Sequence, residues 1–174
     1  ALMAKKYDAV VASMIATDER KQKIDFTRHY YRTPLSVAVS RDSDITDAQT
    51  NFKGRTIGAQ SSSTQAIYAE DHYGPAGADV KLYPTLDEAN SDLATGRIDG
   101  VIADKFPLLA WVDSTGKDCC KIIGDVNGTT ADASIAVRKG DDVLRERFNK
   151  ALDEIVADGT YKKISSRYFA FDIY

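Results

Sequence analysis

Short apolar runs alternate along the chain with stretches whose apolar residues recur at helical spacing. Such runs, bounded by polar residues or glycine, are typical of strands buried in a sheet. They cover residues 8–13, 55–59, 79–83, 99–103, 121–123 and 134–137. Helical spacing and helix-start residues predict helices over residues 18–23, about 64–69, 86–95, 106–112, 142–157 and 161–168. Strands that alternate with helices predict parallel α/β layers.

The composition is that of a compact globular protein. Hydrophobic residues make up 43% of the chain and charged residues 28%, close to the average for soluble domains. No apolar run approaches the roughly 18 residues that a membrane helix needs. The net charge of −3 argues against a nucleic-acid partner, which would normally require a basic surface. A length of 174 residues allows one domain or two small lobes.

The chain has two cysteines, and they are neighbours, Cys119 and Cys120. Neither a C-x-x-C pair nor a histidine-rich spacing accompanies them, so we expect no metal and no cofactor. A bond between adjacent cysteines closes a strained ring. We therefore expect two thiols at the edge of a loop, with a vicinal or intermolecular disulfide as the alternative.

Polar residues follow three of the predicted strands at their carboxyl ends, where ligands bind in parallel α/β sheets. They are Ser13, the run from Ser61 to Gln65, and Asp104. Small hydroxylated residues at a strand-to-helix turn expose backbone N–H groups that suit a carboxylate. Ordinary helix capping is the alternative for the serine run and for Asp104, and a surface charge is the alternative for Arg20.

Several motifs follow one another along the chain in a fixed order. They are Tyr7 to Met14, Thr17-Asp18-Glu19-Arg20, Phe26-Thr27 with Tyr30-Tyr31, Lys53 to Gly58, Ser63-Thr64-Gln65, Asp92 to Asp99 followed by Asp104, and Asp158 to Ile164 with Tyr168-Phe169. In this order they resemble the polar amino-acid solute-binding proteins of bacterial ABC transporters. The resemblance covers nearly the whole chain and is strongest to the branch that binds basic amino acids and opines.

The resemblance implies an α/β fold of the type II periplasmic-binding-protein kind, with two lobes, two crossing segments and an amino acid clamped between the lobes. Residues 34–126 correspond to a complete second lobe, in which residues 35–39 form an extended crossing segment. Residues 1–33 and 127–174 correspond to a first lobe without the family's N-terminal part. We expect this truncation to weaken or abolish ligand binding and to expose strand edges through which the chain forms a homodimer.

The resemblance also implies a ligand-binding site. Arg20 corresponds to the arginine that holds the ligand α-carboxylate, and Ser13 to the serine that completes this cradle through its backbone or hydroxyl. Thr64 corresponds to a helix-start residue on the same carboxylate, and Asp104 to the acceptor for the α-ammonium group. The expected pocket-lining residues of the second lobe are Gln60, Ser61, Ser63 and Gln65. The chain departs from the family at Ile15, where a hydroxylated residue is usual.

By this resemblance the chain is a periplasmic solute-binding component that captures an amino acid or opine for an inner-membrane ABC permease, without chemistry on the ligand. One alternative is a hydrolase that uses a hydroxyl of Ser61 to Ser63, with His29 or His72 as the base. The absence of a G-x-S-x-G motif argues against it. Another alternative is a self-associating interaction protein that has lost ligand binding.

Overall fold

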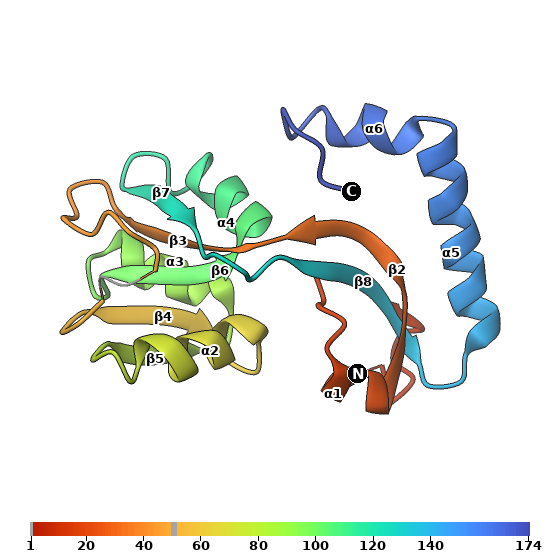
Figure 1. Cartoon of the computed structure of the whole chain (residues 1–174), viewed down its shortest axis with the longest axis horizontal. Helices are drawn as coiled ribbons and strands as arrows, with labels where there is room; N and C mark the ends of the chain where they lie inside the picture. Colours follow the sequence, from red (N-terminus) through yellow and green to blue (C-terminus); the bar gives the residue numbers. More distant parts are fainter. Residues whose placement is uncertain (1, 50–51) are drawn as a thin grey trace. The chain divides into compact units, whose positions relative to one another are not determined.

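The chain divides into two compact units, each with its own sheet (Figure 1). A computed structural model describes residues 2–49 and 52–174. Unit 1 comprises residues 1–33 and 131–174, and unit 2 comprises residues 34–130. Among the described residues, no helix is both long enough and apolar enough to cross a membrane.

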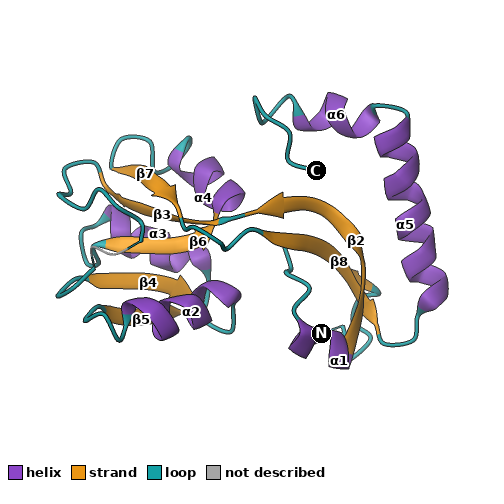
Figure 2. Cartoon of the chain, in the orientation of Figure 1, coloured by secondary structure: helices purple, strands orange, loops and turns teal. Residues whose placement is uncertain are grey.

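Unit 2 is built on a five-stranded mixed sheet in the order β5-β4-β6-β3-β7 (Figure 2). The strands are β3 (Leu35–Ser40), β4 (Thr56–Gln60), β5 (Asp79–Tyr83), β6 (Gly100–Asp104) and β7 (Cys120–Asp125). β4 is parallel to β5 and β6, whereas β3 is antiparallel to β6 and β7. The helices are α2 (Thr64–Tyr68), the π-helix η1 (Ala69–Tyr73), α3 (Leu86–Ala94) and α4 (Lys105–Val112).

Both faces of the unit 2 sheet are buried, because successive residues of a strand point to opposite sides. Along β3, Val37 and Val39 belong to one apolar cluster and Ala38 to another. Residues of α2 and η1, among them Tyr73, close the first cluster, and residues of α3 and α4, among them Leu93, close the second. Unit 2 is therefore a three-layer α/β unit, the arrangement that parallel strands require.

Unit 1 is built on a three-stranded antiparallel sheet in the order β1-β8-β2. The strands are β1 (Ala9–Val10), β2 (Ile24–Thr33) and β8 (Ala131–Arg138), and the helices are α1 (Asp18–Lys23), α5 (Asp142–Ala157) and α6 (Thr160–Ser165). One apolar cluster of this unit contains three buried residues, Leu2, Ile24 and Ala136. The predicted apolar stripe of α5 is only partly covered, since Val143 is 68% exposed.

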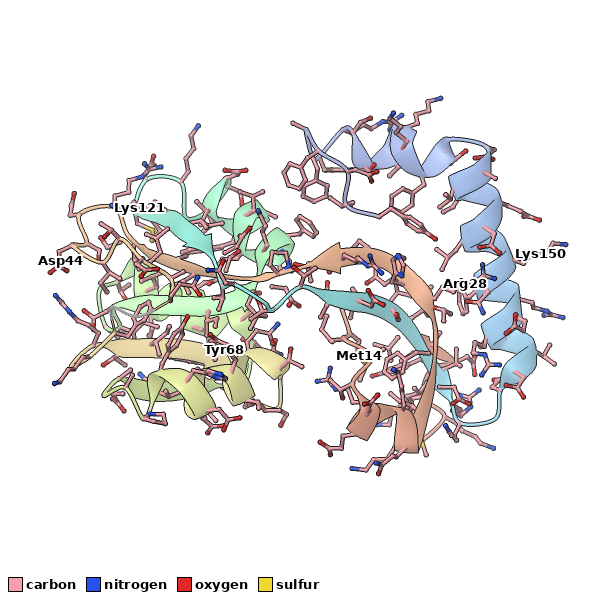
Figure 3. All side chains as sticks on the ribbon, in the orientation of Figure 1. Met14, Arg28, Asp44, Tyr68, Lys121 and Lys150 are labelled. Atoms are coloured by element: carbon pink, nitrogen blue, oxygen red, sulfur yellow. A yellow bond between two sulfur atoms is a disulfide. The ribbon has the colours of Figure 1, made fainter. Side chains whose placement is uncertain are left out.

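The C-terminal segment covers the outer edge of β2. The Arg28 N–H donates to Oδ1 of Asn149 on α5 at 2.9 Å, and the Arg28 side chain lies between β2 and α5 (Figure 3). Further along the strand, the Arg32 N–H donates to the carbonyl of Ile173 at 2.8 Å. These contacts satisfy backbone donors that a strand edge would otherwise leave for a partner chain.

The prediction of parallel layers is correct for β4, β5 and β6. It is wrong for β3, β7 and the strands of unit 1, which pair antiparallel. The first strand covers Ala9–Val10 instead of residues 8–13, because only these two residues pair with β8; the chain then turns, with φ +53° at Ser13. The hydrophobic pattern does not predict β2, because its ten residues contain neither an apolar run nor a regular alternation. Residues 35–39, expected as an extended crossing segment, belong to β3, which lies between β6 and β7 in the unit 2 sheet.

The second boundary between the units falls four residues later than the sequence predicts. Residues 127–130 lie with unit 2, although we assigned them to the first lobe. The side chain of Thr129 explains this placement. Its hydroxyl accepts the Leu35 N–H at 3.0 Å and donates to the Val126 carbonyl at 2.6 Å, which fastens the segment to the start of β3.

Cys119 and Cys120 are bonded to each other, so the expectation of two thiols is wrong and the vicinal disulfide applies. The pair stands at the start of β7, after a tight turn. Both cysteine N–H groups donate to the Gly116 carbonyl, at 3.2 and 2.9 Å, and the Arg41 N–H donates to the Cys119 carbonyl at 2.8 Å. These backbone bonds define a compact turn that accommodates the ring formed by the adjacent cysteines.

A carboxylate on α3 joins three polar side chains of unit 2. Asp92 accepts hydrogen bonds from Tyr83 at 2.7 Å and from Lys81 and Arg97 at 2.9 Å each. The hydrogen bond from Tyr83, followed by those from the two cations, holds the pKa of Asp92 far below its usual range. Asp92 therefore stabilises the folded state in its ionised form.

We expect Asp92→Asn to lower the melting temperature by about 2–4 °C near neutral pH. A carboxyl group whose pKa is lower in the folded state stabilises the fold above its unfolded pKa and loses this contribution as the pH falls. The difference between variant and wild type should therefore narrow below about pH 4. Circular-dichroism melting curves at a series of pH values measure it, with Asp87→Asn in the first turn of α3 as the control. A difference that stays constant as the solution is acidified would contradict this prediction.

Candidate functional site

In unit 2, several predicted site residues lie where β4 passes into α2. Gln60 ends β4 and Ser61 follows it, and both are exposed. Ser63 is the N-cap of α2, since its hydroxyl accepts the Ala66 N–H at 3.1 Å and donates to the Gln60 carbonyl at 2.6 Å. The capping alternative is therefore realised at Ser63, whose hydroxyl already has two partners.

The other residues of this turn have different environments. Thr64 is the first residue of α2 and is half-buried, whereas Gln65 is only 9% exposed. Ser62 has φ +58°, a left-handed conformation that residues other than glycine adopt rarely. Such conformations cluster at ligand-binding sites, where the surrounding structure holds them.

Asp104 is the last residue of β6 and is 7% exposed. Its side chain makes no capping hydrogen bond to α4, so the capping alternative does not apply here. The neighbouring Lys105 forms an ion pair with Asp125 at 2.7 Å. Because β4 and β6 are parallel, with Gly58 opposite Val101, their carboxyl ends lie at one edge of the sheet. This edge brings Asp104 and the turn into α2 to the side where such sheets bind ligands.

In unit 1, Arg20 lies on α1 beside the loop that follows β1. The N-cap residue Thr17 accepts the Arg20 N–H at 3.3 Å, and Nη1 of Arg20 donates to the Ile15 carbonyl at 2.9 Å. The guanidinium is thus hydrogen-bonded to the backbone of this loop and does not extend into solvent as a surface charge. A planar guanidinium with a fixed orientation suits a carboxylate, because it can donate two parallel hydrogen bonds.

Ser13 lies in the same loop, and its backbone N–H donates to the Tyr30 hydroxyl at 2.9 Å. Sequence reasoning did not identify Tyr30 as part of the site, because no local pattern relates residues 17 positions apart. Ile15, where the family usually has a hydroxylated residue, is 8% exposed and forms a β-bridge with Ala133. Ile15 therefore orients Arg20 through its backbone carbonyl, while its side chain is buried.

Unit 1 also contains an open hollow of about 540 Å³ between α1, β2, β8 and α5. Its lining includes Thr27, His29 and Ser134, but none of the predicted site residues. Over the described ranges 2–49 and 52–174, His, Cys, Asp and Glu side chains nowhere form a group of three or more that could hold a metal ion.

The sequence pattern of the bacterial extracellular solute-binding proteins, family 3, matches residues 1–171 of the chain. The L-arginine-binding protein of Pseudomonas aeruginosa is 40% identical over 181 aligned residues, which span 100% of this chain and 69% of that protein. The histidine-binding periplasmic protein of Salmonella typhimurium is 34% identical, with 99% of this chain and 68% of that protein aligned.

Solved structures give the same relationship. An ancestral arginine-binding protein bound to arginine superimposes with a TM-score of 0.88 at 35% sequence identity, over 97% of this chain and 74% of that one. The type II periplasmic-binding-protein fold expected from the sequence is therefore confirmed.

Proposed function

This chain belongs to the bacterial extracellular solute-binding proteins, family 3, and on that premise we propose that it binds a polar amino acid for an ABC transporter. Arginine, histidine and ornithine are the first ligands to test, because relatives at 34–40% identity are named for arginine and histidine and another, at 35%, for lysine, arginine and ornithine. Opines are the next class to test. We propose a periplasmic location and an inner-membrane permease as partner on the same grounds.

The placement of two opposite charges supports this proposal most directly. Asp104, which is 7% exposed, places its carboxylate at the edge of the unit 2 sheet where ligands bind in sheets of this kind. In unit 1, the Ile15 carbonyl orients the Arg20 guanidinium. An α-amino acid carries an ammonium group that suits Asp104 and a carboxylate that suits Arg20, with Ser13 and Thr64 as further donors.

A hydrolase remains the alternative from another class, and the side chains offer it little support. Ser63 uses its hydroxyl in the helix cap. His72 hydrogen-bonds the Tyr68 carbonyl through Nδ1 at 3.1 Å and stacks on the Tyr68 ring. His29 belongs to unit 1 and forms a contact with Asp132. None of these contacts pairs a histidine with a serine hydroxyl, as nucleophile activation requires. Recovery of unaltered ligand after incubation would distinguish binding from turnover.

We also propose that unit 1 self-associates into a homodimer. β1 is a two-residue edge strand. Apolar side chains near it are exposed, with Met3 at 66% and Val11 at 61%. An open strand edge with exposed apolar residues tends to acquire a partner. A non-binding protein that acts through this surface is the second candidate function.

Replacing Arg20 by alanine should weaken binding of the ligand by about 2–5 kcal/mol, because the ligand carboxylate loses its charged partner. This corresponds to a loss of roughly 30-fold or more in affinity. Isothermal titration with L-arginine measures the effect, and Lys21→Ala on the same helix is the matched control. Affinity within a few-fold of the wild type would show that Arg20 does not bind the carboxylate.

Asp104→Asn should abolish the preference for an α-ammonium group while the shape of the side chain is kept. We expect the wild type to bind L-arginine more tightly than 5-guanidinopentanoate, which lacks this group, and the variant to bind both similarly. Competition titrations compare the two ligands, with Asp113→Asn at the far end of α4 as the control. Equal discrimination in wild type and Asp104→Asn would rule out this role.

For self-association, we expect a species of twice 19.1 kDa in size-exclusion chromatography with light scattering. Val11→Lys should shift it toward the monomer, because a charge at a strand edge opposes pairing. Ile67→Lys serves as the control, since Ile67 is 53% exposed but lies in unit 2. A monomer at every concentration would overturn the proposal.

A further inference from the structure

Ser13 adopts a backbone conformation that needs support from its surroundings. Its φ of +53° lies in the left-handed region, where the Cβ of an L-residue comes too close to the backbone. A residue of this kind keeps such a conformation only where neighbouring groups hold it. The loop after β1 must therefore be fastened if Ser13 is to face a ligand in one orientation.

The residues that follow Ser13 are fastened to β8. The Ser134 N–H donates to the Met14 carbonyl at 3.0 Å, and Ile15 bridges to Ala133. Met14 lies on the α1 side of β2 and β8 (Figure 3). At Ser13 itself the contact comes from another strand, since the Ser13 N–H donates to the Tyr30 hydroxyl of β2 at 2.9 Å.

Tyr30 is itself held from two sides. Its ring packs edge-on against Tyr31, with ring centroids 4.9 Å apart. Its carbonyl accepts the hydroxyl of Tyr161 on α6. Burial raises the pKa of Tyr161 to about 12, and the hydroxyl is the donor in this contact because a carbonyl oxygen can only accept. A chain of hydrogen bonds thus runs from α6 through β2 to the Ser13 turn.

We propose that Tyr30 is a positioning residue, whose hydroxyl holds the Ser13 turn in its left-handed conformation so that the Ser13 hydroxyl donates to the ligand carboxylate. This inference rests on the proposed function. It also narrows the role of Ser13, because the Ser13 backbone N–H is committed to Tyr30 and the hydroxyl is the group that meets the ligand. Tyr30 does not touch the ligand in this proposal and acts through Ser13.

The test uses Tyr30→Phe, which removes the hydroxyl and keeps the ring, and Tyr31→Phe as the matched control. Each protein is titrated with L-arginine and with agmatine, which is arginine without its carboxylate. We expect Tyr30→Phe to weaken arginine binding by about 3–10-fold, the effect of one neutral hydrogen bond, and to leave agmatine binding within about two-fold. Tyr31→Phe should change neither. An equal loss for both ligands would overturn the proposal, because it would indicate general damage to unit 1.

A double-variant cycle tests whether Tyr30 acts through Ser13. In a Ser13→Ala background, which lacks the serine hydroxyl, Tyr30→Phe should have little further effect on arginine affinity. An undiminished effect in that background would show that Tyr30 acts by another route.

A measurement without ligand separates this proposal from the proposed function. Tyr30→Phe should accelerate hydrogen exchange of the Ser13 amide, followed by NMR, while Tyr31→Phe should not. If the wild type binds neither ligand, the proposed function fails and the binding role of Tyr30 fails with it. If the wild type binds arginine and Tyr30→Phe changes neither its affinity nor the exchange of Ser13, the positioning role alone is wrong.

Discussion

The antiparallel pairing of β2 with β8 is the interaction on which unit 1 depends. It runs from Ile24 opposite Arg138 to Thr33 opposite Ala131, and so joins two segments that are far apart in the sequence. Apolar residues of both strands are buried beside this backbone ladder, among them Ile24 on β2 and Ala136 and Val137 on β8. The loop that carries Ser13 is hydrogen-bonded to both strands, through Tyr30 of β2 and Ser134 of β8. Disturbing this pairing would therefore disturb the loop that orients Arg20 as well.

Unit 2 positions its site residues in a different way. Apolar residues fill both faces of its sheet, and the parallel register of β4 and β6 then determines where Gln60 and Asp104 end up. A buried sheet has one register, because a slip of a single residue would turn apolar side chains to the wrong face. The placement of Asp104 is thus a consequence of core packing, whereas the placement of Arg20 depends on hydrogen bonds of a loop.

Local signals in the sequence predicted much of unit 2. Thr85 begins α3 with a capping box, and the strands β4, β5 and β6 lie where their apolar runs indicate. In unit 1 the same signals were insufficient, because β2 becomes a strand only through its pairing with β8. The contact of Ser13 with Tyr30 is likewise decided by tertiary structure and not by local pattern. The strand-end pattern indicated Ser13, the Ser61 to Gln65 run and Asp104, and the family resemblance added Arg20, Gln60 and the expected roles, but neither predicted the contacts that hold these residues.

Two of the positions near the site serve the fold and do not present a side-chain hydroxyl to a ligand. Ser63 caps α2, and at Ile15 the chain offers a carbonyl where a hydroxylated side chain is usual in the family. The charged groups Arg20 and Asp104 are therefore the strongest candidates for direct recognition. In the proposed function they bind the carboxylate and the ammonium group that every α-amino acid carries. In that proposal, selectivity among arginine, histidine and ornithine must arise from positions other than these two charges, because all three ligands carry the same α-carboxylate and α-ammonium groups.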